Sequence, residues 1–489
     1  MRVFRDVLSL LPWHRKSTRR SHRRQSSFGE TLEPRELLTV LHWRGGVTTD
    51  NNWSSRQNWV ENRVPTSGDD LVFPSDISAR NHQMKNDLPV SQVYHSLKFQ
   101  DNGYVLDGNR ISVSTGGISA IQFSSTSTAG TVTLKCGIDV PAGVNIPVNV
   151  SPKMVVDFQG PIQGSNTGAM TKSGAGVMRF SGQAGNVFKG TTTVATGALE
   201  LGKTGPLANA ISGTLIVKGD GVRLLASNQI ANGVAVQVSS VVDMNGFSDT
   251  VGSVETGGGG SVKGSGSKLT VTNGVFSIVE TSLAPLKIDV SSFELSGSAV
   301  VMTENTSTVE ISSTIVGSKL TKGGTGTLRL TGNTGNQQTE TVVNAGRLEL
   351  AKAADVVSVT GSLKITESGN NGGTVFLVTP GQLDRRISLT LFGKGTLDLN
   401  GRQVGNLFPA SGVSEQGDIQ TLEMTGGTIM SSTGNGTIIV PALVQIHASS
   451  TPSVISSFAR FNRHNIANNG STPFKTLHEI TVDAGAFLK

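Results

Sequence analysis

The amino-acid sequence predicts an all-β protein, specifically a parallel β-helix (solenoid). Three observations predict it: the composition, short alternating strands and internal repeats. Glycine accounts for 60 of the 489 residues, while 16% of the residues are charged and 5% are aromatic. A disordered chain would carry more charge, and a coiled coil would be rich in Ala, Glu, Lys and Leu. No run approaches the roughly 18 consecutive apolar residues that a membrane-spanning helix needs.

Short stretches of alternating apolar and polar residues recur from about residue 114 onward, separated by glycine, asparagine or serine. A period of two residues is typical of strands with one buried face. The clearest stretches begin with glycine and place two apolar residues on one face: 197–201, 213–217, 326–330, 346–350 and 395–399. No segment shows a sustained helical period, so strands are expected throughout this part of the chain.

A block of about 150 residues occurs twice in the sequence. Residues 170–183 match residues 320–333 at an offset of 150, and residues 197–201 match residues 346–350 at an offset of 149. Internal repeats are typical of solenoids, in which each unit packs only against its neighbours.

A finer period of about 20 residues lies within each block. Arg179 stands between two apolar residues, and Glu200 occupies the equivalent position of the next such stretch; Arg329 and Glu349 repeat this relation in the second block. A coil of that length would place each strand about 4.8 Å above the previous one, with arginine beside glutamate on the outer surface. The sequence therefore predicts that these strands are adjacent rungs of a parallel β-helix, with glycine and asparagine at its corners.

The repeated segments resemble the bacterial autotransporter-associated β-strand repeat. That repeat reads apolar-Thr-Lys-x-Gly-x-Gly-x-apolar-x-apolar-x-Gly-Asn, then a turn, then Thr-x-Val-x-x-Gly-x-Leu-x-Leu. Residues 170–201 and 320–350 follow it nearly throughout, and the first copy departs at Gln183, Ala195 and Thr196. The resemblance implies a right-handed β-helix displayed outside the cell, and it brings no catalytic residues.

Residues 1–40 are expected to form a basic targeting leader without fixed structure. Residues 1–25 carry a formal charge of +7. Because the whole chain has a net charge of +6, the remaining residues carry a net charge of −1. The string Leu-Glu-Pro-Arg-Glu-Leu-Leu at residues 32–38 resembles the N-terminal motif of large secreted or surface proteins of planctomycete-type bacteria, which implies export or surface targeting. Alternatively, this leader binds nucleic acid or anionic lipid. The near-neutral body has no basic stripe, so no nucleic acid is expected to bind it.

Residues 41–113 are predicted to form a tryptophan-rich cap at the N-terminal end of the β-helix. Trp43, Trp53 and Trp59 lie close together in the sequence and are interleaved with asparagines. One interpretation is a hydrophobic plug that closes the end of a β-structure and protects its unpaired edge. The other is a platform of aromatic rings that stack on carbohydrate.

The sequence shows no set of catalytic, cofactor-binding or metal-binding residues. Residues 197–204 match the P-loop pattern, but their centre is the strand of the repeat, and the following Gly-Pro opposes the helix that a P-loop needs. Asp69 and Asp70 are neighbours that would point to opposite faces of a strand, so turn or cap roles are expected for them. The eight histidines are scattered and are interpreted as surface or tail residues. Cys136 is the single cysteine, which excludes an internal disulfide.

These observations favour an exported, non-enzymatic protein of the cell surface or extracellular space with a structural or adhesive role. Its expected partners are envelope, matrix or glycan surfaces, and no cofactor or metal is expected. The alternative is a carbohydrate-binding or carbohydrate-active β-helix that uses Trp43, Trp53 and Trp59. The β-helix is expected to occupy residues 114–489, and residues 484–489 look like the start of a third repeat, as in a truncated gene product.

Overall fold

The computed structural model describes residues 39–482, apart from residues 48, 121–129, 278–283, 385, 405–418, 434–435, 441–442, 457 and 462–478. The chain divides into two units, Met1–Leu37 and Leu38–Lys489, and the described residues belong to the second. The predicted leader with its motif at residues 32–38, and the third repeat at residues 484–489, lie outside the described residues.

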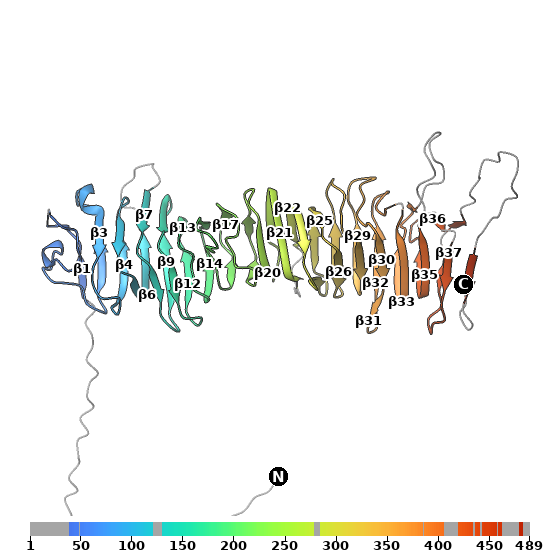
Figure 1. The fold of residues 1–489 in the computed structure, drawn as a ribbon, viewed down its shortest axis with the longest axis horizontal. Helices are drawn as coiled ribbons and strands as arrows, with labels where there is room; N and C mark the ends of the chain where they lie inside the picture. The colour runs from blue at the N-terminus through green and yellow to red at the C-terminus, as the bar shows by residue number, and fades with distance from the viewer. Residues whose placement is uncertain are drawn as a thin grey trace, which may run out of the picture. The chain divides into compact units, whose positions relative to one another are not determined.

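The second unit is a parallel β-solenoid, which confirms the predicted fold class. Each coil pairs in parallel with the coil before it and the coil after it, so strands follow one another along one axis from β1 to β37 (Figure 1). The helical segments among the described residues are two short 3₁₀ turns, η1 (Arg56–Asn58) and η2 (Ala79–His82). In the part of the chain that the structure describes, no helix has the length and apolar character needed to cross a membrane.

The first of three strand ladders runs through nearly every coil. It consists of β1 (Val40–His42), β2 (Asp70–Phe73), β4 (Val93–Phe99), β6 (Ile111–Ala120), β9 (Asn145–Val150), β12 (Ala169–Ser173), β14 (Thr191–Val194), β16 (Leu215–Val217), β18 (Ala235–Val238), β20 (Asp249–Thr256), β21 (Ser261–Ser277), β23 (Val300–Thr303), β26 (Lys319–Gly323), β28 (Glu340–Val343), β30 (Ser362–Ile365), β33 (Ser388–Asp398), β35 (Thr421–Met430), β37 (Leu443–Ile446) and β40 (Glu479–Val482). Strand β6 crosses the predicted cap boundary at residues 113 and 114, so the tryptophan-rich segment forms the first coils of the same solenoid.

The second ladder is equally continuous. It consists of β3 (Gln83–Asn86), β5 (Val105–Gly108), β7 (Gly130–Leu134), β10 (Met154–Phe158), β13 (Val177–Gly182), β15 (Ala198–Lys203), β17 (Gly221–Leu224), β19 (Val241–Asp243), β21, β22 (Leu286–Leu295), β24 (Thr308–Ile311), β27 (Thr327–Leu330), β29 (Gly346–Leu350), β32 (Asn371–Leu377), β33, β35 and β38 (Val454–Ile455). Long strands such as β21 take part in more than one ladder because they bend around a corner of the coil.

The third ladder is interrupted. Its first segment consists of β6, β8 (Ile138–Val140) and β11 (Ile162–Gly164), and its second of β20, β21, β22 and β25 (Thr314–Val316). Its third segment consists of β34 (Gln403–Val404), β36 (Thr437–Val440) and β39 (Phe458–Phe461). Outside these ladders, the short β31 (Glu367–Ser368) pairs antiparallel with β32. Side chains supplement the backbone hydrogen bonds between coils where this ladder is broken. Asn186 accepts a hydrogen bond from the amide of Ile162 in the coil below and donates one to the carbonyl of Ala210 in the coil above. Asn336, at the equivalent position of the second repeat, does the same with Ile315 and Ser358.

The interior is filled by apolar side chains stacked rung upon rung. Met178, Leu199 and Val222 occupy the same inward position in three successive coils, and all three are buried. Such stacks account for the predicted alternation, because the inner face of each strand must be apolar while the outer face meets solvent.

The outer face of the second ladder carries charges of alternating sign in seven successive coils. The aligned positions are Asp157, Arg179, Glu200, Arg223, Asp243, Lys263 and Asp289. The Arg179 guanidinium lies 2.6 Å from the Glu200 carboxylate. Further along, Arg329 lies 3.0 Å from Glu349, so the predicted pairs do lie on adjacent rungs. Coils two rungs apart carry the same sign of charge at this position. If one coil paired with the next but one instead of its neighbour, like charges would face each other, so the alternation favours the observed order of coils.

Four lysines of the residues that the structure describes lie in the interior, two in each repeat. Lys172 lies inward between Val148 and Val194 of adjacent coils, and its ammonium donates to the carbonyls of Ser173, Gly174 and Thr196 at 2.7–3.2 Å. Lys322 is its counterpart in the second repeat, and it donates to the carbonyls of Gly323, Gly324 and Ala345 at 2.5–3.2 Å.

Lys203 and Lys352 form the second pair. The Lys203 ammonium donates to the carbonyls of residues 158–160, and the Lys352 ammonium to those of Ser313 and Thr331, at 2.9–3.2 Å in both cases. Burial lowers the pKa of each of the four lysines to about 8. They therefore remain mostly protonated at neutral pH and supply donors to backbone carbonyls in the interior of the solenoid.

We predict that Lys322→Met lowers the free energy of unfolding by about 1–3 kcal/mol, because three backbone carbonyls, two buried and one partly buried, lose their donor. The matched control is Lys319→Met on the same strand, where the ammonium is solvent-exposed and lies 3.4 Å from Glu340. The control should lose less than about 1 kcal/mol. Urea unfolding followed by circular dichroism measures both, and equal losses would contradict the role assigned to the buried ammonium.

We also predict that Arg329→Glu destabilises the solenoid more than Arg329→Ala does. The new glutamate would lie between its register partners Glu310 and Glu349, so three negative charges would repel one another. Alanine only removes an exposed ion pair, which is worth about 0–1 kcal/mol. High salt should reduce the difference between the two variants, because it screens exposed charges. Thermal unfolding at low and high salt measures this, and a difference that does not respond to salt would argue against the charge ladder.

Candidate functional site

The candidate site from the sequence, the three cap tryptophans, forms the core of the first coils. Trp43, Trp53 and Trp59 are all fully buried. The Trp43 and Trp59 rings pack edge to face at 5.2 Å between centroids, and the Trp53 and Trp59 rings do so at 5.8 Å. Two indole N–H groups donate to backbone carbonyls, Trp43 to Asn81 and Trp59 to Trp53.

This packing fits a hydrophobic plug, because none of the three rings presents an open face to a ligand. A cavity of about 340 Å³ lies beside Trp43, and its walls include Asp50, Asn51, Asn81 and Gln83. Contact of the tryptophans with carbohydrate stays a prediction, and it would require the cap to rearrange.

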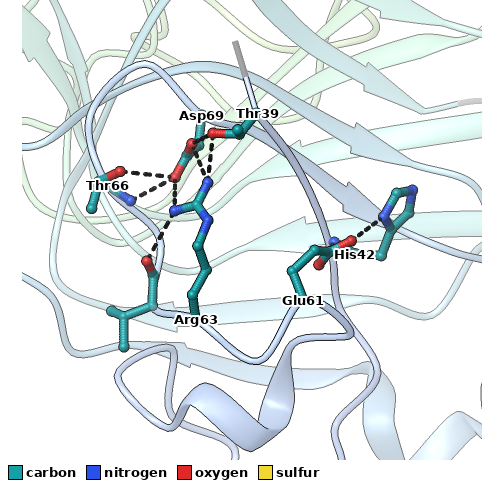
Figure 2. A network of polar contacts seen from close by, with 7 residues as sticks. Thr39, His42, Glu61, Arg63, Thr66 and Asp69 are labelled. Atoms are coloured by element: carbon teal, nitrogen blue, oxygen red, sulfur yellow. Dashed lines mark hydrogen bonds and ion pairs between the residues drawn. The ribbon is translucent and has the colours of Figure 1, made fainter. Parts of the chain in front are cut away.

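A polar network ties the entry strand β1 to the loop before β2 (Figure 2). The Arg63 guanidinium holds both carboxylate oxygens of Asp69, at 2.6 and 2.9 Å. Thr39 donates its hydroxyl to the same carboxylate, and the backbone amide of Thr66 donates to it at 2.7 Å. Burial alone would raise the pKa of Asp69, but these donors hold it below its usual value. Asp69 therefore stays ionised and fixes the loop, which is the cap role expected for it.

Asp70 has separate partners. It begins β2 and lies 2.8 Å from the His95 ring nitrogen, and it also accepts the Ser96 hydroxyl proton. Burial opposes ionisation of Asp70, while these hydrogen bonds lower its pKa. Serine and histidine thus both point at the same carboxylate, and no hydrogen bond activates the serine through the histidine as nucleophilic catalysis requires.

A second network lies close by on β1. The His42 ring lies 2.7 Å from the Glu61 carboxylate, which also accepts the backbone amide of His42 (Figure 2). The first network joins the loop at residues 61–69 to Thr39, just before β1, and the second joins it to His42 in β1, so both position the start of the first ladder.

The interpretation of all histidines as surface or tail residues is wrong for His82. Its ring is buried against Tyr104 at 4.1 Å between centroids, and its Nε2 atom has no hydrogen-bond partner. The Tyr104 hydroxyl donates to the Pro74 carbonyl, so both rings belong to the core beneath η2. Sequence spacing carries no signal for this burial, because His82 lies in a 3₁₀ turn outside the alternating pattern.

The apparent P-loop at residues 197–204 is a strand with an inward lysine. Residues Ala198–Lys203 form β15, and the Lys203 ammonium is held by backbone carbonyls in the interior. A phosphate could reach neither that ammonium nor a helix N-terminus there. Across the part of the chain that the structure describes, no three His, Cys, Asp or Glu side chains gather as a metal site would need.

Comparison with known proteins finds a likeness to an autotransporter adhesin. The chain is similar to the adhesin BmaC autotransporter of Brucella suis biovar 1 (strain 1330), with 28% identity over 282 residues. The match covers 56% of this chain and 7% of that adhesin, so the chain spans a small part of the relative's length. No protein-family profile matches the chain. No solved structure matches it either.

We predict that acid weakens the cap through His82. Burial lowers the pKa of His82 below its ordinary value of 6.5. The negative charge of Asp101 acts in the opposite direction and offsets part of this shift in pKa. As the pH falls below 6.5, the unfolded chain takes up a proton that the folded chain resists, so the free energy of unfolding falls. His82→Phe keeps an aromatic ring against Tyr104 and removes the titration. Urea unfolding at pH 7.5 and 5 should therefore show a smaller acid loss in the variant, and an identical loss would contradict the assignment.

Proposed function

We propose that the chain is an exported, surface-displayed β-solenoid with a structural or adhesive role. The observation that carries this proposal is the combination of the parallel solenoid with the likeness to an autotransporter adhesin. A solenoid suits such a role physically, because each coil adds stability through its neighbours and extends a side-chain surface without requiring a separate core.

The proposal includes a non-enzymatic role. Three carboxylates of the cap are engaged in ion pairs within the fold: Asp69 with Arg63, Asp70 with His95 and Glu61 with His42. Carbohydrate hydrolysis would instead need two carboxyl groups facing each other across an open substrate site. These three carboxylates therefore support attachment of the entry strand to the solenoid better than they support catalysis.

Surface display can be tested in the cells that make the protein. An antibody raised against the solenoid should label intact cells, and external protease should remove that label while a cytoplasmic marker remains. Labelling that appears only after permeabilisation would overturn surface display. Purified protein should also release no reducing ends from a panel of polysaccharides, and release that depends on Asp69 or Asp70 would overturn the non-enzymatic role.

A further inference from the structure

The middle of the solenoid has a groove on the outer surface of the first ladder, away from the cap. Its volume is about 530 Å³, and it extends across β16, β18, β20 and β21. Binding sites for small ligands commonly measure about 300–1,000 Å³. The groove is therefore large enough for a ligand of a few sugar or amino-acid units.

Strand register brings four outward side chains into one line along this groove. Ile216 pairs with Gln237, Gln237 with Glu255, and Glu255 with Phe276. At about 4.8 Å per rung, the three intervals make a line about 14 Å long. Ile216 and Phe276 are half-buried apolar residues at its two ends, and the exposed amide of Gln237 and the half-buried carboxylate of Glu255 lie between them.

A tight glycine-rich turn forms one wall of the groove. The Thr256 hydroxyl donates to the carbonyl of Gly259 at 2.6 Å and accepts the amide of Gly258 at 3.0 Å, which folds the turn against the end of β20. Gly257 lines the groove and is exposed. A Cβ built there would meet no atom within 4 Å, so a larger side chain at this lining position has open space to occupy.

The chemistry of this line matches a saccharide. An aromatic ring packs on the C–H face of a sugar, an amide both donates to and accepts from hydroxyls, and a carboxylate accepts from hydroxyls. The strands of the groove floor are already paired on both sides. No backbone edge is therefore offered to an extended peptide, and recognition rests on side chains. Lys218 and Glu255 bring opposite charges to the lining, which does not favour a polyanion.

We propose that this groove binds a neutral oligosaccharide chain lying along the solenoid axis. Phe276 packs on one sugar ring, and Gln237 and Glu255 hydrogen-bond the hydroxyls of the next. The assignment rests on the proposed surface role, because only a displayed groove would meet such a ligand.

The sharpest test is to fill the groove without disturbing the fold. Gly257→Tyr places a ring in the groove at a residue whose backbone is not in the left-handed region. The matched control is Gly233→Tyr, an exposed glycine in another turn whose Cβ would also meet no atom within 4 Å. Both variants should keep the wild-type circular dichroism spectrum and unfolding midpoint.

Purified full-length protein is applied to an array of neutral and acidic oligosaccharides, and the best neutral ligand is measured by isothermal titration calorimetry. We expect binding by wild type and Gly233→Tyr, at least a tenfold loss with Gly257→Tyr, and about a three- to tenfold loss with Gln237→Ala, which removes one or two hydrogen bonds. These measurements use purified protein, so their outcome is independent of whether cells display the chain.

Three results would overturn the assignment. The first is no binding by wild type to any neutral glycan on the array. The second is binding that Gly257→Tyr leaves unchanged, which would place the ligand elsewhere on the solenoid. The third is a Gly257→Tyr-sensitive interaction with deglycosylated matrix protein and none with glycans, which would make the groove a protein-binding site.

Discussion

The whole structure depends on in-register parallel pairing between one coil and the next. Inside the solenoid, this pairing aligns Met178 with Leu199 and Leu199 with Val222. On the outer face of the same strands, it aligns Arg179 with Glu200. Because successive side chains of a strand point to opposite faces, a shift of one residue would exchange the core and the surface. The apolar stacks, the charge ladder and the groove are therefore consequences of one register.

The corners are the places where this pairing has to be supplemented. A coil must turn three times, and at each turn some carbonyls and amides lose their strand partners. The repeat meets this need with inward lysines such as Lys172 and Lys322, and with asparagines such as Asn186 and Asn336, which bond the backbone of neighbouring coils. These side chains recur at the same positions in the two repeats, so the repeat encodes its corners as well as its strands.

Much of the fold could be predicted from sequence, because regular spacing carries the information. The 20–21-residue separation of Arg179 from Glu200 and of Arg329 from Glu349 is enough to place them on adjacent rungs. The role of Lys172 could not be predicted in that way, because its partners are backbone carbonyls, which have no sequence signature. The burial of His82 could not be predicted either, since it depends on a ring contact with Tyr104 from a later coil.

The groove could not be predicted from sequence for a related reason. Its outward residues are separated by unequal intervals, since the stretch from Ile216 to Gln237 is longer than the stretch from Gln237 to Glu255. Because turn lengths vary from coil to coil, a constant sequence period would not align Ile216, Gln237 and Glu255. Their alignment is seen only in the strand register of the structure. The cap tryptophans show the opposite case: their clustering was visible in sequence, but their burial was decided by packing.

The most direct test of this account is disulfide trapping on the outer face of the second ladder. Residues on adjacent rungs have Cα atoms about 4.8 Å apart, within disulfide range, whereas residues two rungs apart are about 9.6 Å apart and beyond it. Arg179→Cys with Glu200→Cys should therefore cross-link under mild oxidant, and Arg179→Cys with Arg223→Cys should not. Native Cys136 will not compete, because it is buried and burial raises its pKa to about 12. Efficient cross-linking of the two-rung pair, or none of the adjacent pair, would contradict the coil register.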